Sequence, residues 1–283
     1  MAVTLPRDVL AQYYRFSLYN SPFDAHDEGC AIDLYPEGAC APSPVAGEVL
    51  DTKTVRAPPK AYAAEHDHLV LVDTGEHVAR ILHVDPRVEP GESVAVGDDL
   101  GDLVRAGFFA PWVPNHVHLG FRDPDANSYR ASGSLPVDVA ADVEAVPWDG
   151  RGTVVAAGET WARLDAPEHP APGERFAGVA NGVGGGNPSV LDGGFPHYDG
   201  GGLLGGRGGE HAALAGKRVG TADGRTVAWD DVTVLANGEA VTGIALFCDR
   251  ERAGVKLVGR EIDLDVGDAV RVTIEGVGGA DPG

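Results

Sequence analysis

The chain has 283 residues, of which 43 are acidic and 22 are Lys or Arg, so its formal net charge is -21 at pH 7. This length allows two domains with ordinary hydrophobic cores. The excess of carboxylates would repel phosphate groups, so neither nucleic acid nor an anionic membrane surface is expected as a partner.

The three cysteines, Cys30, Cys40 and Cys248, have no framework spacing, which argues against a disulfide-stapled secreted domain. The stretch Met1–Phe23 has no apolar run of signal-peptide length, and no later run approaches the length of a membrane span. We therefore expect a cytoplasmic protein. Its acidic composition is typical of a halophilic protein, because high salt screens the repulsion between surface carboxylates.

The composition also predicts the fold class. Forty Gly, twenty Pro and many β-branched residues favour short strands joined by turns, so we expect mainly β structure. We place a domain boundary near Gly150, with one domain over residues 1–150 and a second β-rich domain over residues 151–283. In the second domain, residues 178–209 are dominated by Gly and are predicted to form a long loop or a mobile lid. The predicted strands that follow are Thr226–Leu235, Ala240–Phe247, Gly254–Leu264 and Ala269–Glu275.

The segment 115–121 reads Asn-His-Val-His-Leu-Gly-Phe. If it is extended, His116 and His118 face one way and the apolar Val117 and Leu119 face the other. Neutral imidazole is a common zinc ligand, and its pKa near neutrality suits a catalytic base. Taken alone, the pattern fits either a metal site or a partly exposed strand with two ordinary histidines.

Three further candidates precede this segment. His26 lies in a polar turn around Gly29, and Asp33 lies in the short apolar strand that follows the turn. His83 ends a predicted strand over residues 77–83, where a side chain can reach into a groove.

In order and spacing, residues 24–125 resemble the lysostaphin-type (LytM-like) zinc metallopeptidases, which have the duplicated hybrid motif fold. The segment 38–49 is similar to the family's Gly-Thr-Pro-Val-Tyr-Ala-Pro-Ala-Asp-Gly-Thr-Val, and residues 80–84 resemble its Tyr-Ala-His-Leu strand. Residues 94–98 resemble its Val-Lys-x-Gly-Gln corner, and residues 114–121 its Gly-Pro-His-Leu-His-Phe-Glu strand. The resemblance implies a small β-sheet or barrel-sandwich hybrid for the first domain.

The resemblance also implies a site. Its metal ligands would be His26, Asp33 and His118, which would hold Zn2+, and its catalytic pair would be His83 and His116. The implied function is a zinc metalloendopeptidase that hydrolyses a peptide bond of a peptide or peptide-containing substrate through a zinc-activated water. The alternative is a catalytically inactive LytM-like fold that binds a peptide or a protein partner.

One feature departs from the family's pattern. Six residues separate His26 from Asp33, whereas the family has three. In a regular strand this offset would place the two side chains on opposite faces. Either the polar residues 27–29 form a bulge or a turn, or Cys30, which has the family's distance from His26, takes the ligand position of Asp33.

A carrier domain is a further alternative. The segment Ser43–Val49 also resembles the opening of biotinyl and lipoyl carrier domains. Those domains need a modifiable Lys on the hairpin after the Val94–Asp98 corner, and this region of the chain has no Lys. The metallopeptidase resemblance is therefore preferred.

The charge of the chain gives a first prediction. On dialysis from molar salt to about 0.1 M, the screening length grows from about 3 to 10 Å, so repulsion between surface carboxylates should lower the stability of the fold. Melting the protein in both buffers checks this expectation. An unchanged melting temperature would reject the adaptation to high salt.

Overall fold

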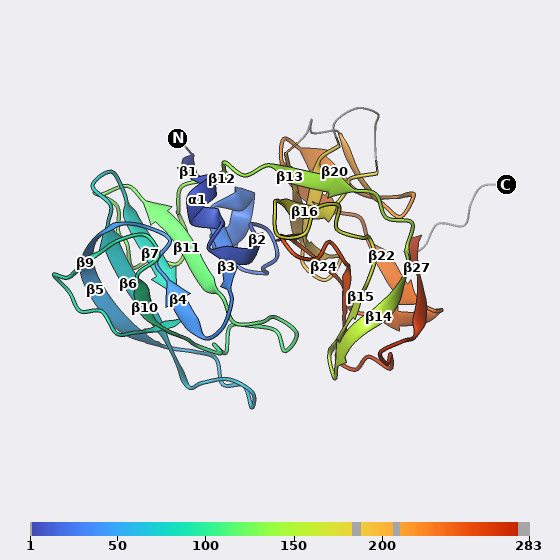
Figure 1. Cartoon of the computed structure of the whole chain (residues 1–283), viewed down its shortest axis with the longest axis horizontal. Helices are drawn as coiled ribbons and strands as arrows, with labels where there is room; N and C mark the ends of the chain where they lie inside the picture. The colour runs from blue at the N-terminus through green and yellow to red at the C-terminus, as the bar shows by residue number, and fades with distance from the viewer. Residues whose placement is uncertain (1, 183–187, 206–209, 277–283) are drawn as a thin grey trace. The chain divides into compact units, whose positions relative to one another are not determined.

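A computed structural model describes residues 2–182, 188–205 and 210–276, which form two units whose regular secondary structure is almost wholly strand. The first unit contains Met1–Leu18 and Phe23–Ala141, and the second contains Tyr19–Pro22 and Asp142–Gly283. The strands of both units can be followed by colour in Figure 1. The expected mainly β class, with two β-rich domains, is confirmed.

The second unit begins before the predicted boundary at Gly150. Its first strand, β13 (Val143–Val146), pairs in parallel with β16 (Phe176–Val179) of the same unit. Trp148 also belongs to the hydrophobic core of that unit. The residues just before Gly150 are thus part of the second domain.

The elements of the first unit are β1 (Val3–Leu5), α1 (Arg7–Leu10), β2 (Tyr13–Ser17), the 3-10 helix η1 (Asp24–Gly29), β3 (Ala31–Pro36), β4 (Cys40–Pro42), β5 (Gly47–Arg56), β6 (His66–Asp73), β7 (Val78–Leu82), β8 (Val84–Pro86), β9 (Ser93–Val94), β10 (Asp99–Leu103), β11 (Val117–Arg122) and β12 (Val137–Val139). Seven of these strands form an antiparallel series in the order β2-β3-β11-β7-β6-β5-β9. A second sheet has the order β4-β10-β8, and β1 pairs in parallel with β12.

Apolar residues fix the middle of the seven-stranded series. Ile32 and Leu34 of β3, and Val117 and Leu119 of β11, have no exposed surface. These pairs face each other across the two strands, with Val117 opposite Leu34 and Leu119 opposite Ile32. Because side chains alternate along a strand, the residues between them, Asp33 and His118, share the other face.

The further elements of the second unit are β14 (Arg151–Gly158), β15 (Trp161–Leu164), β17 (Val190–Phe195), β18 (Gly200–Leu204), β19 (His211–Leu214), β20 (Lys217–Asp223), β21 (Thr226–Trp229), β22 (Val232–Ala236), β23 (Glu239–Val241), β24 (Gly243–Leu246), β25 (Cys248–Asp249), β26 (Lys256–Val258) and β27 (Ala269–Gly276). Twelve strands are linked in the order β19-β20-β21-β18-β17-β24-β26-β15-β14-β27-β22-β23.

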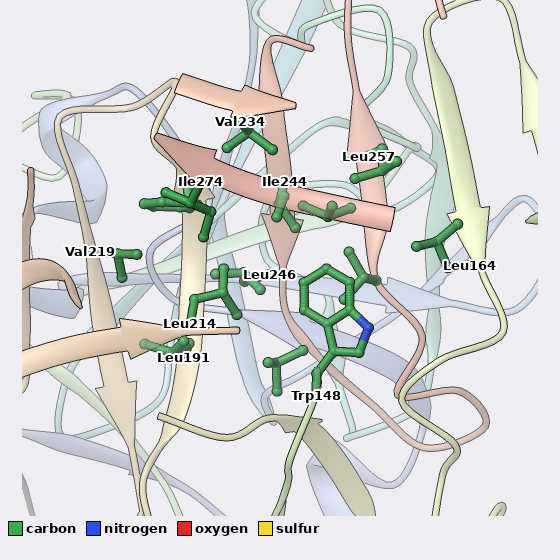
Figure 2. Packing of buried hydrophobic residues seen from close by; sticks show 14 of the residues in the cluster. Trp148, Leu164, Leu191, Leu214, Val219, Val234, Ile244, Leu246, Leu257 and Ile274 are labelled. Atoms are coloured by element: carbon green, nitrogen blue, oxygen red, sulfur yellow. The ribbon is translucent and has the colours of Figure 1, made fainter. Parts of the chain in front are cut away.

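One apolar cluster forms the core of the second unit. Figure 2 shows Trp148 facing a group of aliphatic side chains that includes Leu191 of β17, Leu246 of β24 and Ile274 of β27. These residues are far apart in sequence and all are at least nine-tenths buried. Burial of this shared surface, at about 25 cal/mol for each Å² removed from water, is the main force that holds the strands together.

The prediction of a long loop over residues 178–209 is wrong for its described part. The end of β16 and the whole of β17 and β18 lie in it, and Gly193 is paired with Gly201 across β17 and β18. The absent side chains leave room for aromatic rings, since a Cβ on Gly201 would overlap the ring of Trp229 and one on Gly202 would overlap the ring of Tyr19. Residues 183–187 and 206–209 of the predicted loop lie outside the described residues.

The other predicted strands of this domain are partly correct. Residues 226–235 contain two strands, β21 and β22, and residues 240–247 contain most of β23 and all of β24. Within residues 254–264 the strand is limited to β26. In the described parts of the chain, no helix is long and apolar enough to cross a membrane.

The packing of Gly201 gives a second prediction. We expect Gly201→Ala to lower the free energy of unfolding by about 1–3 kcal/mol, because the added methyl group forces the buried face of β18 away from Trp229. Trp229 cannot swing aside easily, since its ring packs edge-on against Phe195 at 5.2 Å between centroids. Denaturant unfolding measures the change.

The matched control is Gly276→Ala at the end of β27. A Cβ there would meet no atom of the described residues within 4 Å, so its effect should stay within about 0.5 kcal/mol. Equal effects of the two substitutions would contradict the packing of the aromatic ring on the glycine strand.

Candidate metal centre

Two of the predicted metal ligands are positioned by neighbouring strands. His118 of β11 lies directly opposite Asp33 of β3 in the antiparallel register. Opposed residues on one face of a strand pair bring their Cβ atoms to about 5 Å. The Nδ1 atom of His118 is thereby 3.0 Å from Oδ1 of Asp33.

His26 reaches the same place from the turn before β3. It lies in η1, and its backbone N–H donates to the carbonyl of Phe23 at 2.9 Å. The helix is then interrupted at Asp27, which has ψ 137°, and at Glu28 and Gly29, which have φ values of 55° and 70°. The six residues between His26 and Asp33 thus contain a turn, which is one of the two alternatives that the sequence leaves open.

The three side chains converge on a small triangle of donor atoms. Nε2 of His26 is 3.1 Å from Nδ1 of His118 and 3.3 Å from Oδ1 of Asp33, and the third edge is the 3.0 Å contact between Asp33 and His118. Tetrahedral zinc with bonds of about 2.1 Å keeps neighbouring ligand atoms about 3.4 Å apart. The triangle is slightly tighter than this, and it fits a zinc ion after a small outward shift of the donors.

The orientation of His26 also suits a metal ligand. Its Nδ1 is 2.7 Å from the carbonyl oxygen of Leu18. A carbonyl can only accept, so Nδ1 carries the proton and Nε2 presents its lone pair to Asp33 and His118. A second hydrogen bond of this kind is typical of histidines that bind metals.

Burial and pairing together set the protonation states of the site. It lowers the pKa of His118 to about 3 and that of His116 to about 4, because the charged imidazolium loses its hydration. Burial alone would raise the pKa of Asp33, but its charge interactions with His116 and His26 and its hydrogen bonds with His118 and His26 hold that pKa well below the usual range. An ionised carboxylate and neutral imidazoles are the forms that bind a metal.

The two predicted catalytic histidines lie beside the triangle. The ring of His116 is 5.1 Å from that of His83, and that of His83 is 5.8 Å from that of His118, measured between centroids. Nε2 of His116 is 3.4 Å from Oδ1 of Asp33, and its Nδ1 is 2.9 Å from the carbonyl oxygen of Pro114. The five residues predicted from the sequence are thus brought together.

Aromatic rings cover this pair of imidazoles. Phe109 lies 4.6 Å from His83 and 4.4 Å from His116 between ring centroids, and Tyr35 lies 5.1 Å from His116. Arg105 fixes the segment that carries Phe109, since its guanidinium donates to the carbonyl groups of Val113, Ala110 and Pro111. These contacts leave His83 only 7% and His116 only 3% exposed, and burial of this kind strengthens the electrostatic interactions among the imidazoles.

A further carboxylate was not found from the sequence. Asp67 of β6 is fully buried, and its Oδ2 is 2.6 Å from Nδ1 of His83. Asp67 stands between His66 and His68 at the start of a strand. That local pattern shows neither that Asp67 is buried nor that it pairs with His83, which lies 16 positions away.

Cys30 is not part of the group. The ligand atoms that lie within 4.8 Å of one another, among the described residues, belong to His26, Asp33 and His118. Cys30 is half-buried, and its thiol forms no disulfide with another described cysteine. The geometry therefore favours Asp33 over Cys30 as the third donor.

Comparison with known families assigns both halves of the chain to domains without a known function. Residues 4–139 match the N-terminal domain and residues 144–275 match the C-terminal domain of a family described as Domain of unknown function (DUF8155). The two matches follow each other along the chain, so both domains of this family are present. No curated protein and no solved structure matches the chain significantly.

The choice between Asp33 and Cys30 gives a third prediction. Asp33→Ala should weaken zinc binding by more than about 100-fold, because loss of an outer hydrogen-bond partner of a metal ligand alone costs about 10- to 100-fold. The matched variant Cys30→Ser should keep the affinity of the wild-type protein. Competition with a chromophoric chelator measures both affinities.

Cobalt substitution tests the same point independently. A thiolate ligand would give the cobalt protein a strong sulfur-to-metal charge-transfer band in the near ultraviolet. Such a band, lost in Cys30→Ser, would assign the third position to the cysteine.

Proposed function

We propose that the N-terminal domain is a zinc-dependent, LytM-like endopeptidase that hydrolyses a peptide bond. The observation that carries the proposal is the triangle of His26, Asp33 and His118, whose donor atoms are 3.0–3.3 Å apart. Two nitrogens and one carboxylate oxygen form a typical donor set for catalytic zinc, which keeps its fourth position open. A purely structural zinc site would be closed by a fourth protein ligand.

A zinc ion bound by these residues supplies a Lewis acid, which acidifies water and polarises a carbonyl group. The side chains would hold the ion and offset its charge. His26 and His118 hold the donor triangle as neutral imidazoles, and Asp33 contributes the negative charge that offsets part of the charge of the ion. The buried strands β3 and β11 keep Asp33 and His118 at a fixed separation.

His83 and His116 would move protons. Each ring directs Nδ1 to an oxygen atom of the protein, of Asp67 for His83 and of Pro114 for His116. When Nδ1 carries the proton, Nε2 of the neutral ring can accept one from the attacking water. The oxygen of that water bonds to the carbonyl carbon, the C–N bond breaks, and the proton passes to the amine that leaves. The second imidazole can hydrogen-bond the carbonyl oxygen as negative charge develops on it.

The surroundings of the site fit a peptide. Phe23 is 46% exposed and packs edge-on against Phe108, whose ring centroid is 6.5 Å from that of His83. Phe108 thus links the exposed ring of Phe23 to the imidazoles, and an exposed aromatic ring can receive an apolar side chain of the substrate. The same rim would serve a catalytically inactive module that binds a peptide or a protein partner.

Zinc content separates the two functions. A peptidase purified without added metal should contain about one zinc ion per chain by elemental analysis, whereas a binding module needs none. A metal-free protein that still binds peptides would support the module.

The roles of His83 and His116 give the fourth prediction. His83→Ala or His116→Ala should lower hydrolysis by about 100- to 10,000-fold, because a general acid or base contributes that much to the rate. Zinc should stay bound in both variants, since neither residue belongs to the donor triangle. Internally quenched peptides with mass spectrometry of the products report hydrolysis, and elemental analysis reports zinc.

The control is His66→Ala, which removes an exposed histidine from β6 and should leave both readouts unchanged. Loss of stoichiometric zinc in His116→Ala would make His116 a fourth ligand. This result would be the most informative one, because Nε2 of His116 lies 3.4 Å from Oδ1 of Asp33. Full hydrolysis by both variants would reject the assigned roles.

A further inference from the structure

The buried pair of Asp67 and His83 has a geometry that the donor triangle does not require. Both oxygens of Asp67 are engaged, since Oδ1 accepts the backbone N–H of His68 at 2.8 Å and Oδ2 lies 2.6 Å from Nδ1 of His83. Asp67 has no exposed surface, and His83 is 7% exposed. A desolvated carboxylate is stable only when it is paired in this way.

We propose that Asp67 is a positioning residue, which fixes His83 as the tautomer protonated at Nδ1 and presents its Nε2 atom for proton transfer. The inference rests on the proposed peptidase, in which His83 handles protons. Asp67 itself would touch neither the substrate nor the metal. It would act only through the ring that it orients.

The hydrogen-bonding capacity of a carboxylate supports the tautomer. An ionised carboxylate can only accept, so the short contact at Oδ2 requires that Nδ1 of His83 donates. Burial alone would raise the pKa of Asp67, but the hydrogen bond and charge of His83, with the N–H of His68, lower it. The carboxylate therefore stays ionised at neutral pH.

The backbone of His83 indicates that this orientation is under constraint. Its φ is 70°, a left-handed conformation that costs a residue with a side chain about 1–2 kcal/mol. Backbone bonds hold it, with the N–H of His83 donating to His68 at 3.2 Å and the N–H of Val104 donating to His83 at 2.8 Å. In this strained conformation the ring of His83 lies 5.1 Å from that of His116 and 5.8 Å from that of His118, between centroids.

A second Asp and His pair in the same domain lacks these features and serves as the control. Oδ1 of Asp85 is 3.6 Å from Nε2 of His68, a distance too long for a hydrogen bond. The side chain of Asp85 is 65% exposed. Asp85→Asn thus removes a carboxylate whose contact with the neighbouring His68 is too long for a hydrogen bond.

Asp67→Asn tests the proposal because its hydrogen bonding is predictable. The amide oxygen should keep the position of Oδ1, where the N–H of His68 needs an acceptor. The NH2 group then takes the place of Oδ2 and donates to Nδ1 of His83. The proton of the ring must move to Nε2, so the variant should hold the opposite tautomer in almost the same shape.

The tautomer is read in the full-length, metal-free protein labelled with 15N-histidine. Long-range 1H–15N correlation spectra distinguish the two ring nitrogens, and His83→Gln assigns the signals of His83. We expect protonated Nδ1 in the wild-type protein and in Asp85→Asn, and protonated Nε2 in Asp67→Asn. A wild-type His83 protonated at Nε2 overturns the proposal, and this measurement decides it even if Asp67→Asn fails to fold.

Kinetics and zinc content complete the test. Asp67→Asn should lower kcat by about 100-fold or more with little change in KM, while about one zinc ion per chain is kept and Asp85→Asn stays at the wild-type rate. An unchanged tautomer together with an unchanged kcat in Asp67→Asn would reduce Asp67 to a structural residue. If the wild-type protein binds no zinc and hydrolyses no peptide, the proposed peptidase function is rejected. The spectra would still report the tautomer of His83.

Discussion

Asp33 and His118 lie opposite each other because β3 and β11 pair in one antiparallel register. A slip of one residue would turn one of the two side chains to the other face of the sheet and destroy the donor triangle. The same slip would expose apolar residues that are now fully buried, such as Ile32 and Leu119. The hydrophobic packing of the first domain therefore holds the candidate metal centre in register.

The polar cluster on the buried face is tolerated because its members pair with one another. Leaving a hydrogen-bonding group unpaired in such a place costs roughly 1–3 kcal/mol. Backbone carbonyls of Leu18 and Pro114 orient His26 and His116, and the carboxylate of Asp67 orients His83. Each of these three oxygen atoms thus lies against Nδ1 of its ring, which turns Nε2 of that ring away from it.

The packing of the second domain depends on glycine residues that lie against aromatic rings. Its glycine-rich strands β17 and β18 lie so close to Tyr19 and Trp229 that a side chain on Gly201 or Gly202 would overlap a ring. Glycine weakens a strand through its conformational entropy. Burial of large aromatic surfaces against the flat glycine strands offsets this cost, and the resulting layer joins the cluster around Leu191 and Ile274.

The sequence by itself determined the mainly β class, because alternation and turn residues are written in adjacent positions. A resemblance in the order and spacing of its motifs implied the set of histidines and the carboxylate that the structure gathers at one place. It left open whether Asp33 or Cys30 faces the site, because the answer depends on the positive φ of Glu28 and Gly29, which a pattern of residue types does not encode.

Only the tertiary structure decided the remaining features. The glycine-rich segment was predicted as a loop because its composition lacks apolar side chains, and it became strands because distant aromatic rings cover it. Asp67 has no signal in the sequence, because a carboxylate beside two histidines is usually solvated, and only the fold brings His83, just after β7, against it. In each case the deciding contact joins residues that are separated along the chain, and its free energy comes from burial and pairing that exist only once the strands have assembled.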